Sequence, residues 1–254
     1  MHHPREADLP VSTAEHLAQL RDIGLTVIPN VYGREDCNVY IARCGRLVEG
    51  SGADTQNIWN FFRRDPELLP LVTNPLMDEI LTEVMGEDYT LTAANIINRQ
   101  KLGSSQANYA ADWHTDSRYV GDERLDKGFC YSVLIMLDDF GADNGATHYI
   151  PGTHKRRDKP CRHGEYGHQV LTGEAGTMVI FDSGVWHRGG PSSTKSRWGV
   201  FSLYSPWYVK PYWNYPEMMG EEWGKQASPL MRRLLHYTSQ PPRDETVRIN
   251  TLVK

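Results

Sequence analysis

The sequence predicts a mainly β protein with flanking helices, whose core is a β-barrel or jelly roll. Apolar residues recur at helical spacing up to about residue 85, and from about residue 89 they alternate with the period of strands. Gly and Asn separate the predicted strands at short intervals, as in antiparallel sheets. No repeat, low-complexity tract or linker interrupts the 254 residues, a length that suits one domain of this kind.

Three helices are expected in the first third of the chain. The first begins at a capping box over residues 12–15 and ends at Gly24. The third begins at Asn74, with Pro75 in its first turn, and ends at Gly86. The apolar faces of the three helices comprise, in order, Leu17, Leu20 and Ile23; Cys37, Tyr40, Ile41, Cys44, Leu47 and Val48; and Met77, Ile80, Leu81 and Val84.

Strands are expected over residues 89–98, 129–137, 147–150, 177–181 and 198–204. The dipeptide Asn144-Gly145 is typical of a hairpin turn. A final helix begins at Ser228-Pro229 and carries Leu230, Leu234 and Leu235. The prediction is one domain over 1–254, with a helical layer over about 1–88, the β core over about 89–206, and an aromatic and helical segment over about 207–254.

Composition excludes several classes of protein. The 27 basic and 32 acidic residues give a net charge of −5, so no positive field would attract nucleic acid or an anionic membrane. The longest apolar run, 133–137, falls far short of the roughly 20 residues of a membrane span. The start of the chain lacks the pattern of a signal peptide, so we expect a cytoplasmic protein. Its four cysteines show no C-x-x-C pair and are expected to be reduced thiols.

One short motif has the spacing of a metal site. In His114-Thr115-Asp116, the period of two would place the imidazole and the carboxylate on one face of a strand. Non-heme iron(II) sites that activate oxygen use two histidines and one carboxylate, and leave the remaining positions open. A second such pair, His163-Gly164-Glu165, lies in a polar stretch and is expected to be a surface loop.

A third candidate ligand follows later in the chain. Residues 173–190 predict a turn, a strand and a second turn that ends at His187. Arg197 stands ten residues further on, where a strand begins, and its guanidinium could enter the barrel and bind a carboxylate.

With these motifs the sequence resembles the phytanoyl-CoA dioxygenase family of iron(II)- and 2-oxoglutarate-dependent oxygenases. The resemblance covers residues 24–29, 113–116, 143–147, 150–154 and 181–190, together with Arg197. It implies a double-stranded β-helix core, the jelly roll of cupin-like proteins. It also implies that His114, Asp116 and His187 bind iron(II), with oxygen as the other reactant.

The resemblance further implies how 2-oxoglutarate binds. Arg197 would hold its distal carboxylate, and Asn95 and Thr147 lie where family members contact this cosubstrate, although both residues also suit a structural hydrogen bond. The family often carries a hydroxyl residue two positions after the distal histidine. This chain has Gly189 there, so its cosubstrate contacts are expected to differ in detail.

The expected reaction is oxidation of a C–H bond of a small molecule, with the substrate drawn from secondary metabolism. The outcome would be hydroxylation or oxidative cyclisation, and orthoester formation in a glycosidic antibiotic is one example. Asp116 argues against halogenation, because related halogenases have a small residue there. The aromatic residues of 207–215 would either face a hydroxylated ligand or pack the helical layer on the barrel.

Two alternatives remain open at this level. One is an acyl-CoA hydroxylase of the same family, in which the basic residues of 155–162 would hold phosphates instead of forming a solvated lid. The other is a metal-binding, cupin-like protein that is not an oxygenase, although the cupin H-x-H spacing is absent. His154 is expected to serve turn structure and not the metal. The oligomeric state is left open.

Overall fold

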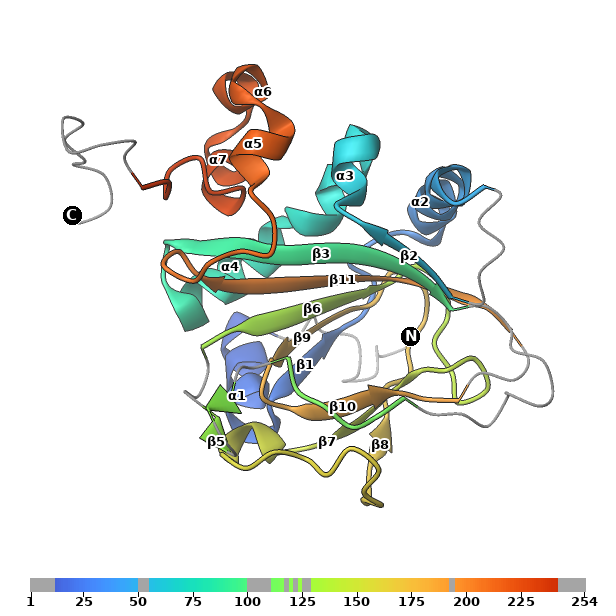
Figure 1. Cartoon of the computed structure of the whole chain (residues 1–254). Coiled ribbons are helices and arrows are strands. Elements are labelled where there is room, and N and C mark those ends of the chain that lie inside the picture. Colours follow the sequence, from blue (N-terminus) through green and yellow to red (C-terminus); the bar gives the residue numbers. More distant parts are fainter. Residues whose placement is uncertain are drawn as a thin grey trace, which may run out of the picture.

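Two antiparallel sheets face each other in the structure, a computed structural model that describes residues 12–49, 55–99, 111–116, 119–120, 123–124, 129–191 and 195–241 (Figure 1). The larger sheet has the strand order β1-β9-β6-β11-β3-β2 and the smaller has the order β10-β7-β8. This arrangement, with helices outside the larger sheet, confirms the predicted fold class. The strands are β1 (Leu25–Ile28), β2 (Thr55–Trp59), β3 (Tyr89–Arg99), β4 (Tyr119–Val120), β5 (Glu123–Arg124), β6 (Tyr131–Met136), β7 (Thr147–Ile150), β8 (Gln169–Val170), β9 (Met178–Asp182), β10 (Trp186–Gly189) and β11 (Arg197–Pro206).

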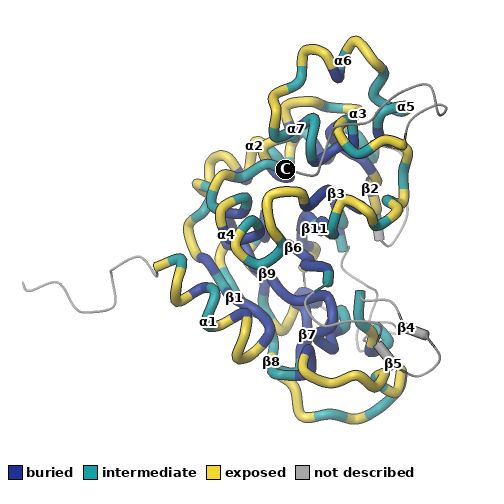
Figure 2. Tube along the Cα trace, turned by 90° about the vertical axis from the view of Figure 1, so that its left-hand side faces the viewer, coloured by how far each residue is buried: buried dark blue, intermediate teal, exposed yellow. Residues whose placement is uncertain are grey.

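The four helices that the sequence predicts are present as α1 (Thr13–Ile23), α2 (Arg34–Leu47), α4 (Pro75–Met85) and α7 (Pro229–Leu234), whereas the helices within 61–72, 153–155 and 215–226 were not predicted. Ser12 and Glu15 form the expected capping box, Gly24 closes the first helix with φ 89°, and Asn74 caps α4 through its side chain. Figures 1 and 2 show α2, α3 and α5 to α7 on the side of the larger sheet that faces away from the smaller one. The helices are α1 (Thr13–Ile23), α2 (Arg34–Leu47), α3 (Phe61–Arg64), η2 (Pro66–Val72), α4 (Pro75–Met85), η3 (Thr153–Lys155), α5 (Tyr215–Met219), α6 (Glu221–Gln226) and α7 (Pro229–Leu234).

Side chains along the central strands point alternately to the two faces of the larger sheet, so the core has two parts. On β6, Val133 and Ile135 face the cluster under the helices, whereas Leu134 and Met136 face the cluster between the sheets. Strand β9 divides in the same way. Both faces of these strands are therefore buried, which explains the unbroken apolar run of 133–137. In the described ranges, no helix is long and apolar enough to cross a bilayer.

Three local expectations were wrong or incomplete. Asn144-Gly145 forms a turn with φ 78° at Gly145, but β6 and β7 on either side belong to different sheets, so it is not a hairpin. Ile23 is 38% exposed at the end of its helix instead of buried. The sequence did not predict β1, β2, β4, β5, β8 and β10 as strands, because a segment of two to five residues gives little periodic signal. Strands β7 and β9 are equally short and were predicted from apolar and β-branched residues bounded by turn residues.

We expect Gly176→Ala to destabilise the fold by at least about 2 kcal/mol. Gly176 has φ 90°, and its carbonyl accepts hydrogen bonds from the backbone of Val31 and Tyr32, so a β-carbon there would overlap the Tyr32 carbonyl. Urea denaturation would measure the change. Gly167→Ala is the matched control, since that position has open space and no positive φ, and its effect should stay within about 0.5 kcal/mol. Equal stability of the two variants would contradict the argument.

Candidate metal centre and its pocket

The backbone brings His114 and His187 side by side. His114 forms an isolated antiparallel bridge with His187, in which each amide donates to the other carbonyl at 3.0 Å. Their rings consequently lie on the same side of the bridge, with centroids 4.3 Å apart. The predicted strand around His114 is thus an extended segment held by one bridge, which suffices to set the direction of the side chain.

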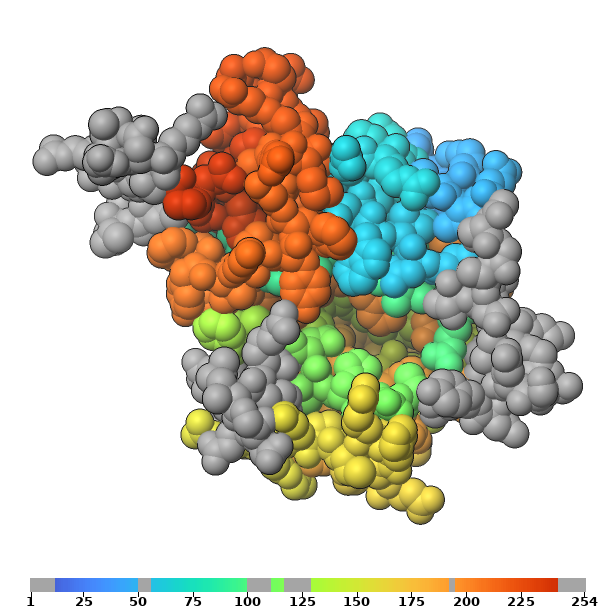
Figure 3. Space-filling model, viewed as in Figure 1, coloured from blue at the N-terminus to red at the C-terminus, as the bar shows by residue number. Residues whose placement is uncertain are grey.

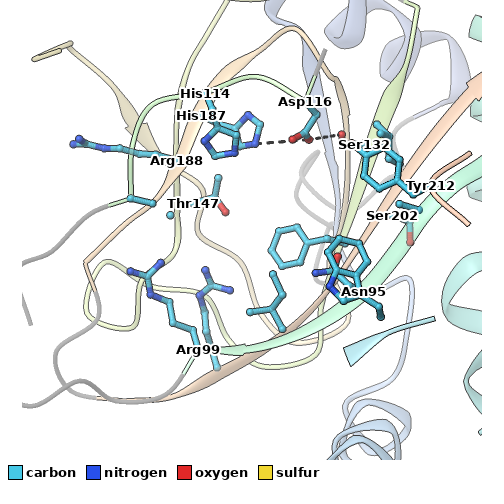
Figure 4. Close-up of a pocket in the computed structure, with 18 residues that line it drawn as sticks. Asn95, Arg99, His114, Asp116, Ser132, Thr147, His187, Arg188, Ser202 and Tyr212 are labelled. Carbon is cyan, nitrogen blue, oxygen red and sulfur yellow. Dashed lines mark hydrogen bonds and ion pairs between the residues drawn. The ribbon is translucent and has the colours of Figure 1, made fainter. Parts of the chain in front are cut away.

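Asp116 completes a three-residue cluster. Its amide donates to the Ser183 carbonyl at 2.9 Å, and its Oδ2 lies 3.8 Å from His187 Nε2 (Figure 4). One ligand atom from each of His114, Asp116 and His187 lies within 4.8 Å of the others. In the described part of the chain, no other group of three His, Cys, Asp or Glu residues comes together in this way. The structure therefore collects the three residues that the sequence singled out.

Hydrogen bonds on the far side of both rings prepare the cluster for a metal ion. Nδ1 of His114 lies 2.9 Å from the Asp112 carbonyl, and Nδ1 of His187 lies 2.9 Å from the Val185 carbonyl. A carbonyl can only accept, so Nδ1 is the donor in each ring, which leaves Nε2 as the nitrogen available to a metal ion. Burial lowers the pKa of His187, and this outweighs the opposing effect of Asp116. Two imidazoles and one carboxylate fit a divalent ion such as iron(II).

The cluster opens onto a cavity of about 420 Å³ between the two sheets. Figure 3 shows this face of the molecule hollowed between the orange and cyan segments above and the green and yellow segments below. A volume of this size is typical of small-molecule sites. The cavity is lined by Trp59, Ala93, Asn95, Ile97, Arg99, Ala111, His114, Asp116, Ser132, Thr147, His187, Arg188, Gly189, Arg197, Phe201, Ser202, Leu203 and Tyr212.

Arg197 lines the same cavity from the start of β11 and is 3% exposed. Its Nε and Nη2 donate to the Gly145 carbonyl, and its guanidinium lies 4.0 Å from the centroid of the Phe140 ring. Its Nη1 is buried and has no hydrogen-bond partner among the described residues. Burial, with the charge of Arg99 adding to it, lowers the pKa of Arg197 to about 9, so the guanidinium remains charged at neutral pH. A buried cation with a free donor fits a carboxylate ligand.

Asn95 and Thr147 also line the cavity, from β3 and β7. The Asn95 amide donates to Asn57 Oδ1 at 2.9 Å, so part of its hydrogen-bonding capacity serves the β2–β3 pair. Thr147 is 8% exposed and pairs with Gly189 across β7 and β10. Both residues lie where a bound cosubstrate could reach them, and their roles remain predictions.

Several cavity residues were not anticipated from the sequence. Arg99 stands four positions after Asn95 on β3, and the period of two could have placed it on the same face. Ser132 donates from Oγ to Asp116 Oδ2 at 2.7 Å. Of the aromatic residues in 207–215, only Tyr212 lines the cavity, whereas Tyr215 is buried under the helices. Packing of the helical layer therefore applies to Tyr215, whereas contact with a ligand stays a prediction for Tyr212.

The residues set aside from the metal site lie elsewhere, as expected. His154 is buried, with Nε2 3.1 Å from the Arg21 carbonyl, and His163 is exposed and lies 3.1 Å from Asp112. In the basic run, Arg156 pairs with Asp158 and Arg162 pairs with Asp112. None of the basic residues of 155–162 lines the cavity.

We expect Ser132→Ala to weaken metal binding about tenfold while the fold is retained. The serine hydroxyl holds Asp116 Oδ2, and loss of a hydrogen bond to a ligand typically costs 10- to 100-fold in metal affinity. Titration of the metal-free protein with Mn(II) would measure the affinity. Ser202→Ala provides the control, because Ser202 lines the cavity and its hydroxyl forms no hydrogen bond with the cluster in the described part of the chain, so wild-type affinity is expected for it. Equal affinities in wild type and Ser132→Ala would argue against a metal-bound Asp116.

Sequence comparison places the chain among known proteins. The family described as "Phytanoyl-CoA dioxygenase (PhyH)" matches residues 20–199. The uncharacterized protein Rv1501 of Mycobacterium tuberculosis is 31% identical over 162 residues, which are 62% of this chain and 58% of that protein, so less than two thirds of that relative is matched. Dioxygenase af480 of Aspergillus fumigatus is 23% identical over 252 residues, covering 90% of this chain and 78% of that protein.

Solved structures with the same fold are also known. HygX from Streptomyces hygroscopicus, with nickel and 2-oxoglutarate bound, has a TM-score of 0.67 at 17% identity and covers 83% of this chain and 95% of its own. The epimerase SnoN, in complex with Fe3+, alpha ketoglutarate and nogalamycin RO, has a TM-score of 0.64 at 15% identity, with 78% of this chain and 86% of its own covered. At these identities the similarity establishes the jelly-roll fold.

Proposed function

Because the chain belongs to the phytanoyl-CoA dioxygenase family, we propose that it is an iron(II)- and 2-oxoglutarate-dependent oxygenase that oxidises a C–H bond of a small molecule. One observation carries the proposal. Three donor atoms within 4.8 Å of one another, from His114, Asp116 and His187, open onto the same cavity as the buried guanidinium of Arg197. A metal site and a carboxylate site in one cavity are what this chemistry requires.

Each residue of the site has a role that follows from the chemistry of its side chain. His114, Asp116 and His187 would hold iron(II), and the bound metal with 2-oxoglutarate and oxygen supplies the oxidising power. Arg197 would bind the distal carboxylate of 2-oxoglutarate, while Asn95 and Thr147 orient the cosubstrate from the two sheets. The protein fixes the ligands through the Asp112 and Val185 carbonyls, so that little reorganisation is needed when the metal binds.

We assign the substrate to secondary metabolism, with hydroxylation or oxidative cyclisation as the reaction. Two observations favour a ring-containing, hydroxylated molecule. Trp59 and Tyr212 line the cavity yet are 42% and 50% exposed, so their aromatic faces stand at its entrance. SnoN and HygX, which share the fold, have been solved with nogalamycin RO and hygromycin B. The basic run of 155–162 lies off the cavity, which gives an acyl-CoA substrate less support.

Cosubstrate turnover tests the proposal. Purified protein would be incubated with iron(II), ascorbate, oxygen and 2-oxoglutarate, with and without candidate substrates, and succinate would be measured. We expect succinate that depends on iron and rises with the correct substrate. Aminoglycosides and aromatic polyketide glycosides form one arm of the substrate panel, and acyl-CoA thioesters form the other.

The alternatives give different results. Stimulation by acyl-CoA thioesters alone would favour the acyl-CoA hydroxylase. Binding of zinc or manganese without any binding of 2-oxoglutarate would favour a cupin-like protein that is not an oxygenase. Either result would overturn the proposal, or the part of it that concerns the substrate.

A further inference from the structure

Two arginines face each other across the sheet inside the cavity. Strands β3 and β11 pair in a register that sets Arg99 directly opposite Arg197, and both side chains line the cavity. Like charges at directly opposed positions destabilise a sheet. The pair is also partly removed from water, because Arg197 is buried and Arg99 is half-buried. Both guanidiniums thus lie in the cavity that the metal cluster opens onto, where a carboxylate ligand could reach them.

The surroundings of Arg99 are built to admit a guanidinium. A β-carbon on Gly189 would overlap Arg99 Nη1, and one on Gly145 would lie 2.8 Å from its Cδ and Nε. The side chain therefore occupies space that two glycines leave open. Gly145 also offers its carbonyl to Arg197, so one turn contacts both arginines.

The Arg99 side chain points toward the metal cluster. Figure 4 shows Arg99 extending from β3 toward Thr147 and the two histidines. Arg188, which also lines the cavity, extends away from its interior in the same view, and its guanidinium lies 4.4 Å from the centroid of the Trp113 ring. Burial lowers the pKa of both Arg99 and Arg197, and for Arg197 the charge of Arg99 contributes as well. An anion between the two guanidiniums would relieve this repulsion.

We propose that Arg99 is a second cosubstrate-binding residue, whose guanidinium acts with that of Arg197 on the carboxylate of 2-oxoglutarate that does not bind the metal. This inference rests on the proposed function. It also gives Gly189 a role, since any side chain at that position would displace Arg99.

Binding measurements on the Mn(II)-loaded protein test the inference without turnover. In Arg99→Gln, the Kd for 2-oxoglutarate by calorimetry should rise about 10- to 100-fold, as expected for loss of hydrogen bonds to a charged group. Arg99→Lys keeps the positive charge but lacks the paired N–H donors of a guanidinium, so its Kd for 2-oxoglutarate should lie between those of wild type and Arg99→Gln. Arg188→Gln is the matched control, because it removes the same charge from the same cavity, and its Kd should stay within about twofold of wild type.

The same measurement with 2-oxobutyrate identifies which carboxylate is involved. This 2-oxo acid lacks the distal carboxylate, so Arg99→Gln should leave its Kd within about twofold of wild type. Equal weakening of 2-oxobutyrate and 2-oxoglutarate would overturn the inference, as would equal weakening by Arg99→Gln and Arg188→Gln. Failure of the wild-type protein to bind 2-oxoglutarate would overturn both this inference and the proposed function, whereas tight binding that Arg99→Gln leaves unchanged would overturn this inference alone.

A second variant tests the space between Gly189 and Arg99. Gly189 has no positive φ, so Gly189→Ala fits the backbone and its main effect should be to displace the guanidinium. We expect it to weaken 2-oxoglutarate binding as much as Arg99→Gln does, and to add less than about twofold when the two are combined. Full additivity would contradict the proposed contact. Thermal unfolding of each variant would verify that the fold persists.

Discussion

His187→Ala should abolish iron-dependent succinate formation and weaken metal binding by more than about 100-fold. The imidazole is one of three donors, and loss of a mere hydrogen-bond partner of a ligand already costs 10- to 100-fold. Apart from His114 and Asp116, no other described His, Cys, Asp or Glu lines the cavity, so no side chain there can take its place. Mn(II) titration and a succinate assay on the same preparation would measure both losses.

The control for this variant is His163→Ala. His163 belongs to the competing H-x-E pair, is exposed and lies off the cavity, so its loss should leave metal affinity and turnover within about twofold of wild type. Thermal unfolding of His187→Ala would separate loss of the ligand from loss of the fold. Wild-type metal affinity in a folded His187→Ala protein would refute the assigned metal site.

Arg197→Gln should raise the Kd for 2-oxoglutarate about 10- to 100-fold and leave metal binding nearly intact. Nη1 of the buried guanidinium has no hydrogen-bond partner in the described part of the chain, and hydrogen bonds to charged groups contribute about 1.5–3 kcal/mol each. Metal affinity should survive because Arg197 is not among the three clustered donors. Turnover at saturating 2-oxoglutarate should therefore fall much less than turnover at low concentrations.

The stability of Arg197→Gln has to be measured as well as its affinity for 2-oxoglutarate. The guanidinium also holds the Gly145 carbonyl and packs on Phe140, so Arg197→Gln carries a structural cost. Arg197→Lys retains a buried charge and is expected to recover part of the affinity. If Arg197→Gln lost metal as completely as His187→Ala, the separate roles given to the two residues would be wrong.

Local features of this protein could be predicted because neighbouring residues determine them. The capping box at Ser12, the cap at Asn74 and the left-handed Gly24 depend on a few adjacent residues. The run of 133–137 is apolar at every position because both faces of β6 are covered, and that property belongs to the strand itself. The pairing of β6 and β7 with different sheets could not be predicted, because Asn144-Gly145 permits a hairpin without requiring one.

The candidate site likewise has features that neighbouring residues determine and features that they do not. The spacing of His114 and Asp116 limits where their side chains can point, so a shared ligand was predictable from the motif. The spacing in His163-Gly164-Glu165 is the same, and only its polar surroundings argued against it. Arg99 could not be assigned, because its role depends on the register of β3 against β11.

By itself, then, the sequence determined the class of fold, the positions of four helices and of the long strands, and the residue types of the metal cluster. Tertiary structure alone decided that His114 bridges His187, that a cavity separates the two sheets, and that Arg99 lies opposite Arg197 in the space left by Gly189. The reason is that periodicity and capping act over a few residues, whereas strand register and the space beside a glycine depend on segments about 50 to 100 residues apart.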